Sequence, residues 1–277
     1  MQKKISFWVL GVIITLSAAI YQRVTGPTHP KSLSFQYKNQ KFEFQLPRSH
    51  NGTDSCLIEF KAPEEIHGSI YYKRFPVDEK WEIIKLKRDQ NKLYAYLPGQ
   101  PPAGKLEYFV DLYSREGPVK LSKENPLVIR FKGKVPNGIL IPHVIIMFLA
   151  MLLSTIAGLF ALGKIKGYRV YGYICLVSLI IGGFIFGPIM QHYAFGDAWT
   201  GFPLGNDLTD NKTLIAAIGW IVAIWGDRKK KRPRYYIFAA LLLLLVYSIP
   251  HSLMGSEYNY DTGDVTTGMI FSNFLPI

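Results

Sequence analysis

Long apolar runs on either side of a polar block constrain the fold of this chain more than any other feature. The runs occupy residues 5–21 and several stretches between Ile139 and Met254, and about one hundred polar residues separate them. A helix that crosses a bilayer needs about 20 consecutive apolar residues. The overall hydrophobic fraction of 49% hides this arrangement, because it averages two different regions. The sequence therefore excludes a single soluble domain or a disordered chain and predicts a multi-span membrane protein with one water-soluble domain.

The apolar runs divide into five candidate spans. The fourth run is only 14 residues long, so we expect its helix to begin earlier, near Leu208. The first is either an uncleaved anchor or a signal peptide cut after Ala19, and its length favours the anchor. The runs cover residues 5–21, 139–162, 170–190, 213–226 and 235–250. They predict an N-terminal anchor over 1–29, an all-α four-helix transmembrane bundle over 137–254 and a tail over 255–277.

The positions of the basic residues predict the orientation. Nine of the 32 Lys and Arg residues lie in two short segments, 164–169 and 228–234, which share one side with Lys3 and Lys4 if five spans alternate. The loop 191–211 and the tail have no Lys or Arg and fall on the other side. The positive-inside rule then places the N-terminus in the cytoplasm and the C-terminus outside. Short loops and a plain export signal favour a bacterial inner membrane, with the polar block in the periplasm or outside the cell.

The polar block has the alternation of an all-β domain. Apolar and polar residues alternate with period two from Ser34 to Pro136, and turn signals such as Asn51-Gly52 separate the segments. Seven or eight strands in about one hundred residues are typical of a β-sandwich, which we predict over 30–136. The block carries 19 basic and 13 acidic residues without a dense patch, so we expect no nucleic-acid binding.

One part of this block has a sequence pattern that is found in a known type of fold. From Tyr71 to Gly117 the chain reads YYKR…W…KLYAYLPGQPPAGKLEYFVDLYSREG, with a tryptophan-bearing strand, a YLPG turn and a tyrosine-bearing strand. This pattern resembles the second half of an immunoglobulin- or fibronectin-type sandwich. The resemblance implies a buried Trp81 and a domain that binds partners or holds a membrane module at a distance. It implies no enzymatic activity, because this fold carries many functions.

The candidate functional residues gather near the outward ends of the predicted spans. Neutral imidazole and carboxylate groups are ligands for zinc, copper or iron, so several of them at one depth predict a transition-metal site. Such residues also cap helices, and Asp207 or Asp210 could cap the fourth helix instead. A non-covalent haem b would use His192 and His251, with His143 able to replace either. It is less favoured than a metal ion, because these ligands lie at the ends of spans instead of inside them. The predicted ligands are His143, His192 and His251, with Asp207, Asp210 and Glu257.

Three functional hypotheses follow from this pattern. The first is a metal-site membrane protein, for metal handling, redox or metal-assisted chemistry, with the loop 191–211 as its functional surface. The second is a non-enzymatic accessory or assembly subunit of an envelope or respiratory complex that docks partners through its sandwich. A small-molecule transporter is least favoured, because no charged residue lies deep in a span. In the third span, Gly183 and Gly187 form a GxxxG motif that predicts close helix packing, within the bundle or in a homo-oligomer or complex.

Overall fold

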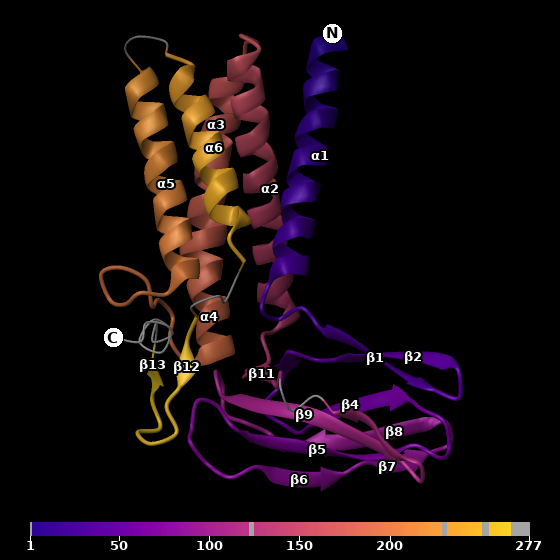
Figure 1. Ribbon diagram of the computed structural model, residues 1–277. Coiled ribbons are helices and arrows are strands. Elements are labelled where there is room, and N and C mark those ends of the chain that lie inside the picture. Colours follow the sequence, from indigo (N-terminus) through magenta and orange to yellow (C-terminus); the bar gives the residue numbers. More distant parts are fainter. Residues whose placement is uncertain (1, 122–124, 229–231, 251–254, 267–277) are drawn as a thin grey trace, which may run out of the picture. The chain divides into compact units, whose positions relative to one another are not determined.

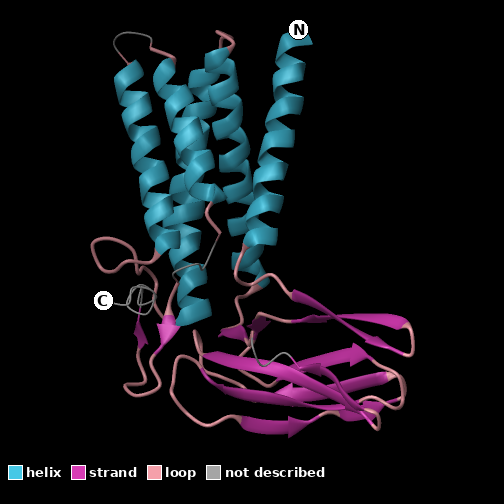
Figure 2. Cartoon of the chain, viewed as in Figure 1, coloured by secondary structure: helices cyan, strands magenta, loops and turns pink. Residues whose placement is uncertain are grey.

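The apolar segments of the sequence form the helices of one of two compact units. The computed structural model describes residues 2–121, 125–228, 232–250 and 255–266. The helical unit takes residues 1–27 and 135–256, and the β unit takes 28–134 and 257–266 (Figure 2). The helices are α1 (Gln2–Thr25), α2 (Asn137–Leu162), α3 (Tyr168–Leu179), the π-helix η1 (Ile180–Phe186), α4 (Gly187–Phe195), α5 (Leu208–Asp227) and α6 (Arg234–Ser248).

Among the residues that the structure describes, three helices are long and apolar enough to cross a membrane. They are α1, α2 and the continuous helix Tyr168–Phe195, which α3, η1 and α4 form together. The helix α6 is also apolar but has 15 residues, and α5 has 20. The helix α5 begins at Leu208, which confirms the expectation that it extends beyond its apolar run. The start of α1, the end of α5 and the start of α6 lie at one end of this unit (Figure 1).

Small residues bring the helices of this unit into close contact. An added Cβ at Gly158 would lie 2.6 Å from the Cβ of Ala240, so α2 and α6 approach almost backbone to backbone there. Gly183, the first glycine of the GxxxG motif, lies in η1, where an added Cβ would lie 2.4 Å from Cγ2 of Thr213 on α5. The predicted close packing through the third span is therefore found within the bundle, and association between copies stays a prediction.

The β unit consists of short strands in small sheets. The largest sheet has the order β3-β11-β9-β5-β6, with β10 paired to β9; another has the order β4-β8-β7, and β1 pairs with β2. The strands are β1 (Lys31–Tyr37), β2 (Gln40–Leu46), β3 (Ser49–Asn51), β4 (Cys56–Lys61), β5 (His67–Arg74), β6 (Glu82–Lys85), β7 (Lys87–Asp89), β8 (Lys92–Leu97), β9 (Lys105–Ser114), β10 (Gly117–Leu121) and β11 (Leu127–Lys132).

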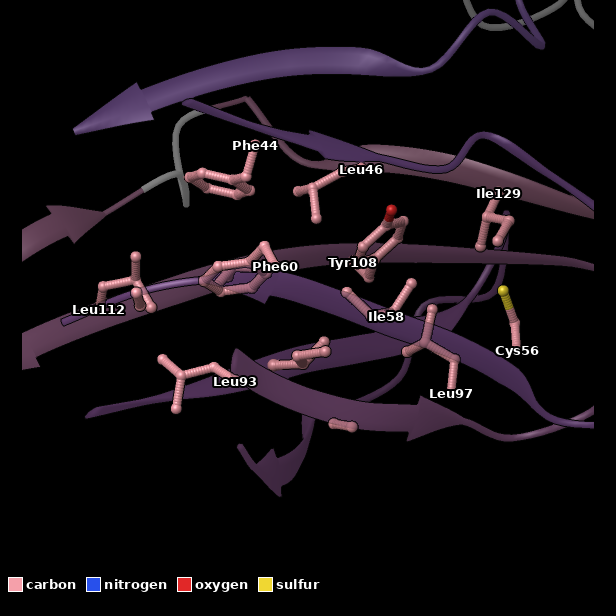
Figure 3. Packing of buried hydrophobic residues seen from close by; sticks show 14 of the residues in the cluster. Phe44, Leu46, Cys56, Ile58, Phe60, Leu93, Leu97, Tyr108, Leu112 and Ile129 are labelled. Atoms are coloured by element: carbon pink, nitrogen blue, oxygen red, sulfur yellow. The ribbon is translucent and has the colours of Figure 1, made fainter. Parts of the chain in front are cut away.

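Side chains from these sheets meet in one hydrophobic core. Every second residue of β4 is buried, which places Cys56, Ile58 and Phe60 in the core and their neighbours outside. The Phe60 ring stacks on Phe44 of β2 with ring centroids 4.5 Å apart (Figure 3). Tyr108 of β9 is fully buried and its hydroxyl donates a hydrogen bond of 2.7 Å to the carbonyl of Pro47. The period-two alternation of the sequence is therefore the pattern that fills this core.

A hairpin from the C-terminal region also belongs to the β unit. Strands β12 (Glu257–Tyr258) and β13 (Val265–Thr266) follow α6 in the chain and pair with each other. The backbone N–H of Tyr258 donates a hydrogen bond of 3.2 Å to the carbonyl of Ala103. The sequence predicts only a polar tail here, because two-residue strands carry no detectable alternation. Residues 257–266 instead pack on the β domain, more than one hundred positions away in the chain.

Candidate functional site

The loop after α4 folds over the start of α5, and Asp207 caps this helix. One carboxylate oxygen of Asp207 accepts hydrogen bonds from the backbone N–H groups of Thr209, at 2.7 Å, and Asp210, at 3.4 Å. The first N–H groups of a helix have no partner inside the helix, and an aspartate at the N-cap supplies one. Of the two roles that the sequence allows for Asp207, the structure contains the capping role.

Asp210 of α5 holds the same loop through hydrogen bonds to Thr200. Its Oδ2 accepts hydrogen bonds from the backbone N–H of Thr200, at 2.7 Å, and from the Thr200 hydroxyl, at 3.3 Å. The side-chain amide of Gln191 donates to the same hydroxyl. Gly201 allows this approach, since an added Cβ would lie 2.6 Å from the Cβ of Asp210. Asp210, Thr200 and Gln191 are all buried, so this network fixes the loop instead of facing solvent.

Lys212 is a buried residue of this region that is not among the predicted site residues. Its side chain is only 1% exposed, and its ammonium group donates a hydrogen bond of 2.8 Å to the carbonyl of Ile249. The side-chain amide of Gln22 on α1 donates to the carbonyls of Tyr247, at 2.8 Å, and Ile249, at 3.3 Å. The last carbonyls of a helix need external donors, and a cation there is favourable. In the sequence, the signal for such a buried cation is a lysine one turn inside an apolar helix.

The structure describes two of the three predicted histidines, His143 and His192. Nδ1 of the half-buried His143 lies 3.0 Å from the carbonyl of Gly182. Gly182 lies in η1, where the π-helical winding changes the backbone hydrogen bonds. His192 is exposed on the last turn of α4, with its ring near that of Tyr193. The third predicted histidine, His251, lies outside the described residues.

Glu257 belongs to the β unit, where it forms a nearly buried ion pair. Its Oε1 lies 2.8 Å from Nζ of Lys105 on β9, and the two side chains are 12% and 10% exposed. Burial lowers the pKa of Lys105 below its usual value, and the Glu257 carboxylate raises it back in part. This carboxylate therefore compensates a buried cation, a role that no local sequence pattern indicates.

Within the described part of the chain, no group of three or more His, Cys, Asp and Glu side chains is arranged to hold a metal ion. The transition-metal and haem sites stay predictions, since they include His251. The side chains of Asp207, Asp210 and Glu257 hold a helix end, a loop and a hairpin. These contacts fix the start of α5 in the helical unit and the C-terminal hairpin in the β unit.

In the β unit, three aromatic residues and an isoleucine lie together on one face of the largest sheet. Tyr71 of β5 lies in register between Ile83 of β6 and Phe109 of β9, and the Tyr71 and Phe109 rings stack 4.8 Å apart. The ring of Trp81 meets Phe109 edge-on at 5.0 Å. These four residues, here called the aromatic face, lie on the side of the sheet opposite the core, since Tyr108 and Val110 point into it.

The resemblance implies that Trp81 is buried, but the structure leaves it half-buried just before β6. Nζ of Lys73 lies 5.1 Å from the Trp81 ring centre and 3.4 Å from a carboxylate oxygen of Glu107.

No protein-family model matches this chain, and no match was found among curated proteins or solved structures. Function is therefore inferred from the residues and their contacts.

Proposed function

We propose that this protein is an accessory subunit of the plasma membrane that binds a protein partner through an exported, immunoglobulin-like β-sandwich. It spans the membrane five times, with α5 and α6 as the fourth and fifth spans and the N-terminus in the cytoplasm. The clustering of the basic residues supports this orientation. Nζ of Lys3 donates a hydrogen bond of 3.2 Å to the carbonyl of Gly163, so the start of α1 and the basic segment after α2 lie together.

The aromatic face is the observation that carries this proposal. Ile83 is 58% exposed and lies beside half-buried Tyr71 and Trp81, on the sheet face opposite the core. Aromatic residues are enriched in protein interfaces, where they supply large contact areas and act as energetic hot spots. Lys73 and Glu107 add a rim of mixed charge, which suits a protein partner better than a polyanion. Among the predicted metal ligands, Asp207, Asp210 and Glu257 instead make contacts that hold the fold together.

Site-specific photocrosslinking in intact cells tests this proposal. A benzophenone amino acid replaces Ile83 in one variant and Tyr96, on β8 of the other sheet, in a matched control. Tyr96 is 53% exposed, so both probes are accessible to a similar degree. We expect an adduct of one defined mass from position 83 and none from position 96. Equal adducts at both positions, or none at either, would contradict docking through the aromatic face.

Binding of the purified partner must then depend on the same residues. Trp81→Ala removes the largest ring of the aromatic face, and hot-spot truncations weaken binding by about 2 kcal/mol or more, roughly thirtyfold. Tyr96→Ala serves as the control and leaves affinity unchanged. If the partner bound wild type and Trp81→Ala equally well, it would not bind through the aromatic face, and the proposal would fail.

Elemental analysis separates the accessory subunit from a metal protein. The sample is detergent-purified protein that has not met a chelator, beside the triple variant His143→Ala, His192→Ala, His251→Ala. The accessory proposal expects no stoichiometric metal, no haem absorption band and an unchanged crosslink in both proteins. Stoichiometric metal that disappears in a folded triple variant would replace this proposal with the metal site.

A further inference from the structure

An apolar groove lies between α5 and α6 in the helical unit. Its volume is about 250 Å³, and it is lined by Ile215, Ile218, Val222, Tyr235, Phe238 and Leu242. Gly219 forms part of its floor, where an added Cβ would lie 2.7 Å from Cδ2 of Leu242. Ile218 and Phe238 are 50% and 65% exposed at its rim. With α5 and α6 as membrane spans, the groove opens to the hydrocarbon of the bilayer.

The groove ends near a group of arginines. Arg234 directly precedes Tyr235, and Arg228 follows Val222 by six residues, which is about 9 Å along a helix. Arg232 lies between them in the chain. Within the part of the chain that the structure describes, these three guanidinium groups form no ion pair.

The nearest carboxylate of α5 does not neutralise these arginines. Asp227 is 1% exposed and accepts a hydrogen bond of 2.6 Å from Nε of Arg169 on α3. The hydroxyl of Tyr168 lies 3.2 Å from the same carboxylate oxygen. Asp227 is therefore committed to joining α3 and α5. The positive charge of Arg228, Arg232 and Arg234 is left available for an anion at the membrane surface.

We infer that the α5–α6 groove binds an anionic phospholipid. One acyl chain lies in the groove, and the phosphate group is held by Arg228, Arg232 and Arg234. Arginine binds phosphate through two parallel hydrogen bonds, and basic clusters at the cytoplasmic end of a membrane helix attract anionic headgroups. The apolar groove and the charged end together select a molecule that is apolar at one end and anionic at the other. The inference rests on the proposed membrane location of α5 and α6.

Native mass spectrometry of the full chain, released from detergent, tests this inference. The probes are phosphatidylglycerol and phosphatidylcholine with identical acyl chains. We expect phosphatidylglycerol to be retained roughly tenfold more strongly than phosphatidylcholine, because only its headgroup carries net negative charge. The triple variant Arg228→Gln, Arg232→Gln, Arg234→Gln loses this preference. The matched variant Lys164→Gln, Lys166→Gln changes the other basic loop and keeps it.

A second pair of variants tests the groove without changing any charge. Val222→Trp fills the groove, because Val222 lines it and is 49% exposed. Ile221→Trp adds the same bulk on α5 outside the groove, at a residue that is 53% exposed. We expect only Val222→Trp to lower retention of phosphatidylglycerol, again roughly tenfold.

Several results would overturn the lipid site. They are equal retention of the two lipids by wild type, an undiminished preference in the arginine variant, or equal effects of the two tryptophan variants. A protein that co-purifies and occupies the groove regardless of lipid charge would identify a partner helix instead. The crosslink at Ile83 depends on the β unit, so failure of the lipid site and failure of the proposed docking function give different results.

Discussion

At the scale of single residues, Asp207 can be assigned as a helix cap by one pair of substitutions. Asp207→Ala removes the acceptor for the N–H groups of Thr209 and Asp210, so we expect the helical unit to lose about 1 kcal/mol of unfolding free energy. Asp207→Asn keeps a cap oxygen and should lose only a few tenths of that amount. Unfolding in mixed detergent, followed by circular dichroism, measures both. Equal losses from the two variants would show that the charge, and not the cap, matters.

Cys56 offers a test of the β core through pH. Burial raises the pKa of its thiol to about 11, from an ordinary value near 9. The thiolate is the reactive form, so alkylation of the folded protein is slow at pH 8 and accelerates as pH approaches 11. Because the unfolded chain releases this proton at lower pH, the thiol's contribution to stability falls as pH rises between about 9 and 11. Fast labelling at pH 8 without denaturant would contradict this burial.

At the scale of elements, a nearly buried ion pair is one of the contacts that join the hairpin β12–β13 to β9. Glu257→Gln leaves the buried Lys105 ammonium without its anion, and breaking such a pair costs about 3 kcal/mol. We expect faster amide hydrogen exchange in β9 and in the hairpin, measured by mass spectrometry on the full chain. The double variant Lys105→Met, Glu257→Leu removes both charges and should recover most protection. A single variant that exchanges like wild type would show that the pair contributes little.

The same pair fixes the direction of a pH effect. The pKa of Lys105 in the fold is lowered below 10.5, so the unfolded chain binds more protons between the two values. Stability therefore rises as pH increases through the window between the lowered pKa and 10.5, as far as this group is concerned. Lys105→Met removes this titration, so the slope of stability against pH in that window should become smaller. An unchanged slope would assign the pH dependence to other groups.

The elements themselves could be predicted from the sequence much better than their contacts. The apolar runs predict the helices, and the start of α5 at Leu208 follows from the length that a span needs. Alternation predicts the strands of the β unit. The pairing of Lys105 with Glu257 could not be predicted, since 152 positions separate them and no local period records the contact.

In the candidate site too, the positions of residues along the helices could be predicted, but their contacts could not. The sequence places His143 and Asp210 near helix ends but does not fix the rotation of each helix, which decides what a side chain meets. His143 meets the carbonyl of Gly182, which the π-helix presents, and Asp210 meets Thr200 in a folded loop. The partner of Lys212 could not be predicted for the same reason, because the accepting carbonyl, that of Ile249, directly follows α6.

At the scale of the whole molecule, the five-span orientation predicts which positions react with a membrane-impermeant maleimide. In the proposed orientation, Tyr96→Cys of the β unit is outside the cytoplasm and should be labelled in intact cells, whereas Lys164→Cys is cytoplasmic and should react only after permeabilisation. The natural thiols of Cys56 and Cys175 are buried, at 4% and 0% exposure, so background labelling is low. Gel shift of the labelled protein measures the result.

Both outcomes of this labelling bear on the proposed function. The proposal needs the aromatic face outside the cytoplasm and the arginines of the α5–α6 groove inside it. Three helices separate them in the chain, namely α2, the helix Tyr168–Phe195 and α5, so the two sites lie on opposite sides only if α5 also crosses. The basic loops make this orientation favourable because cytoplasmic retention of Lys and Arg directs insertion. Labelling of position 164 in intact cells, with protection of position 96, would place the sandwich in the cytoplasm. An exported partner could then not reach Ile83, and the accessory function would have to be abandoned.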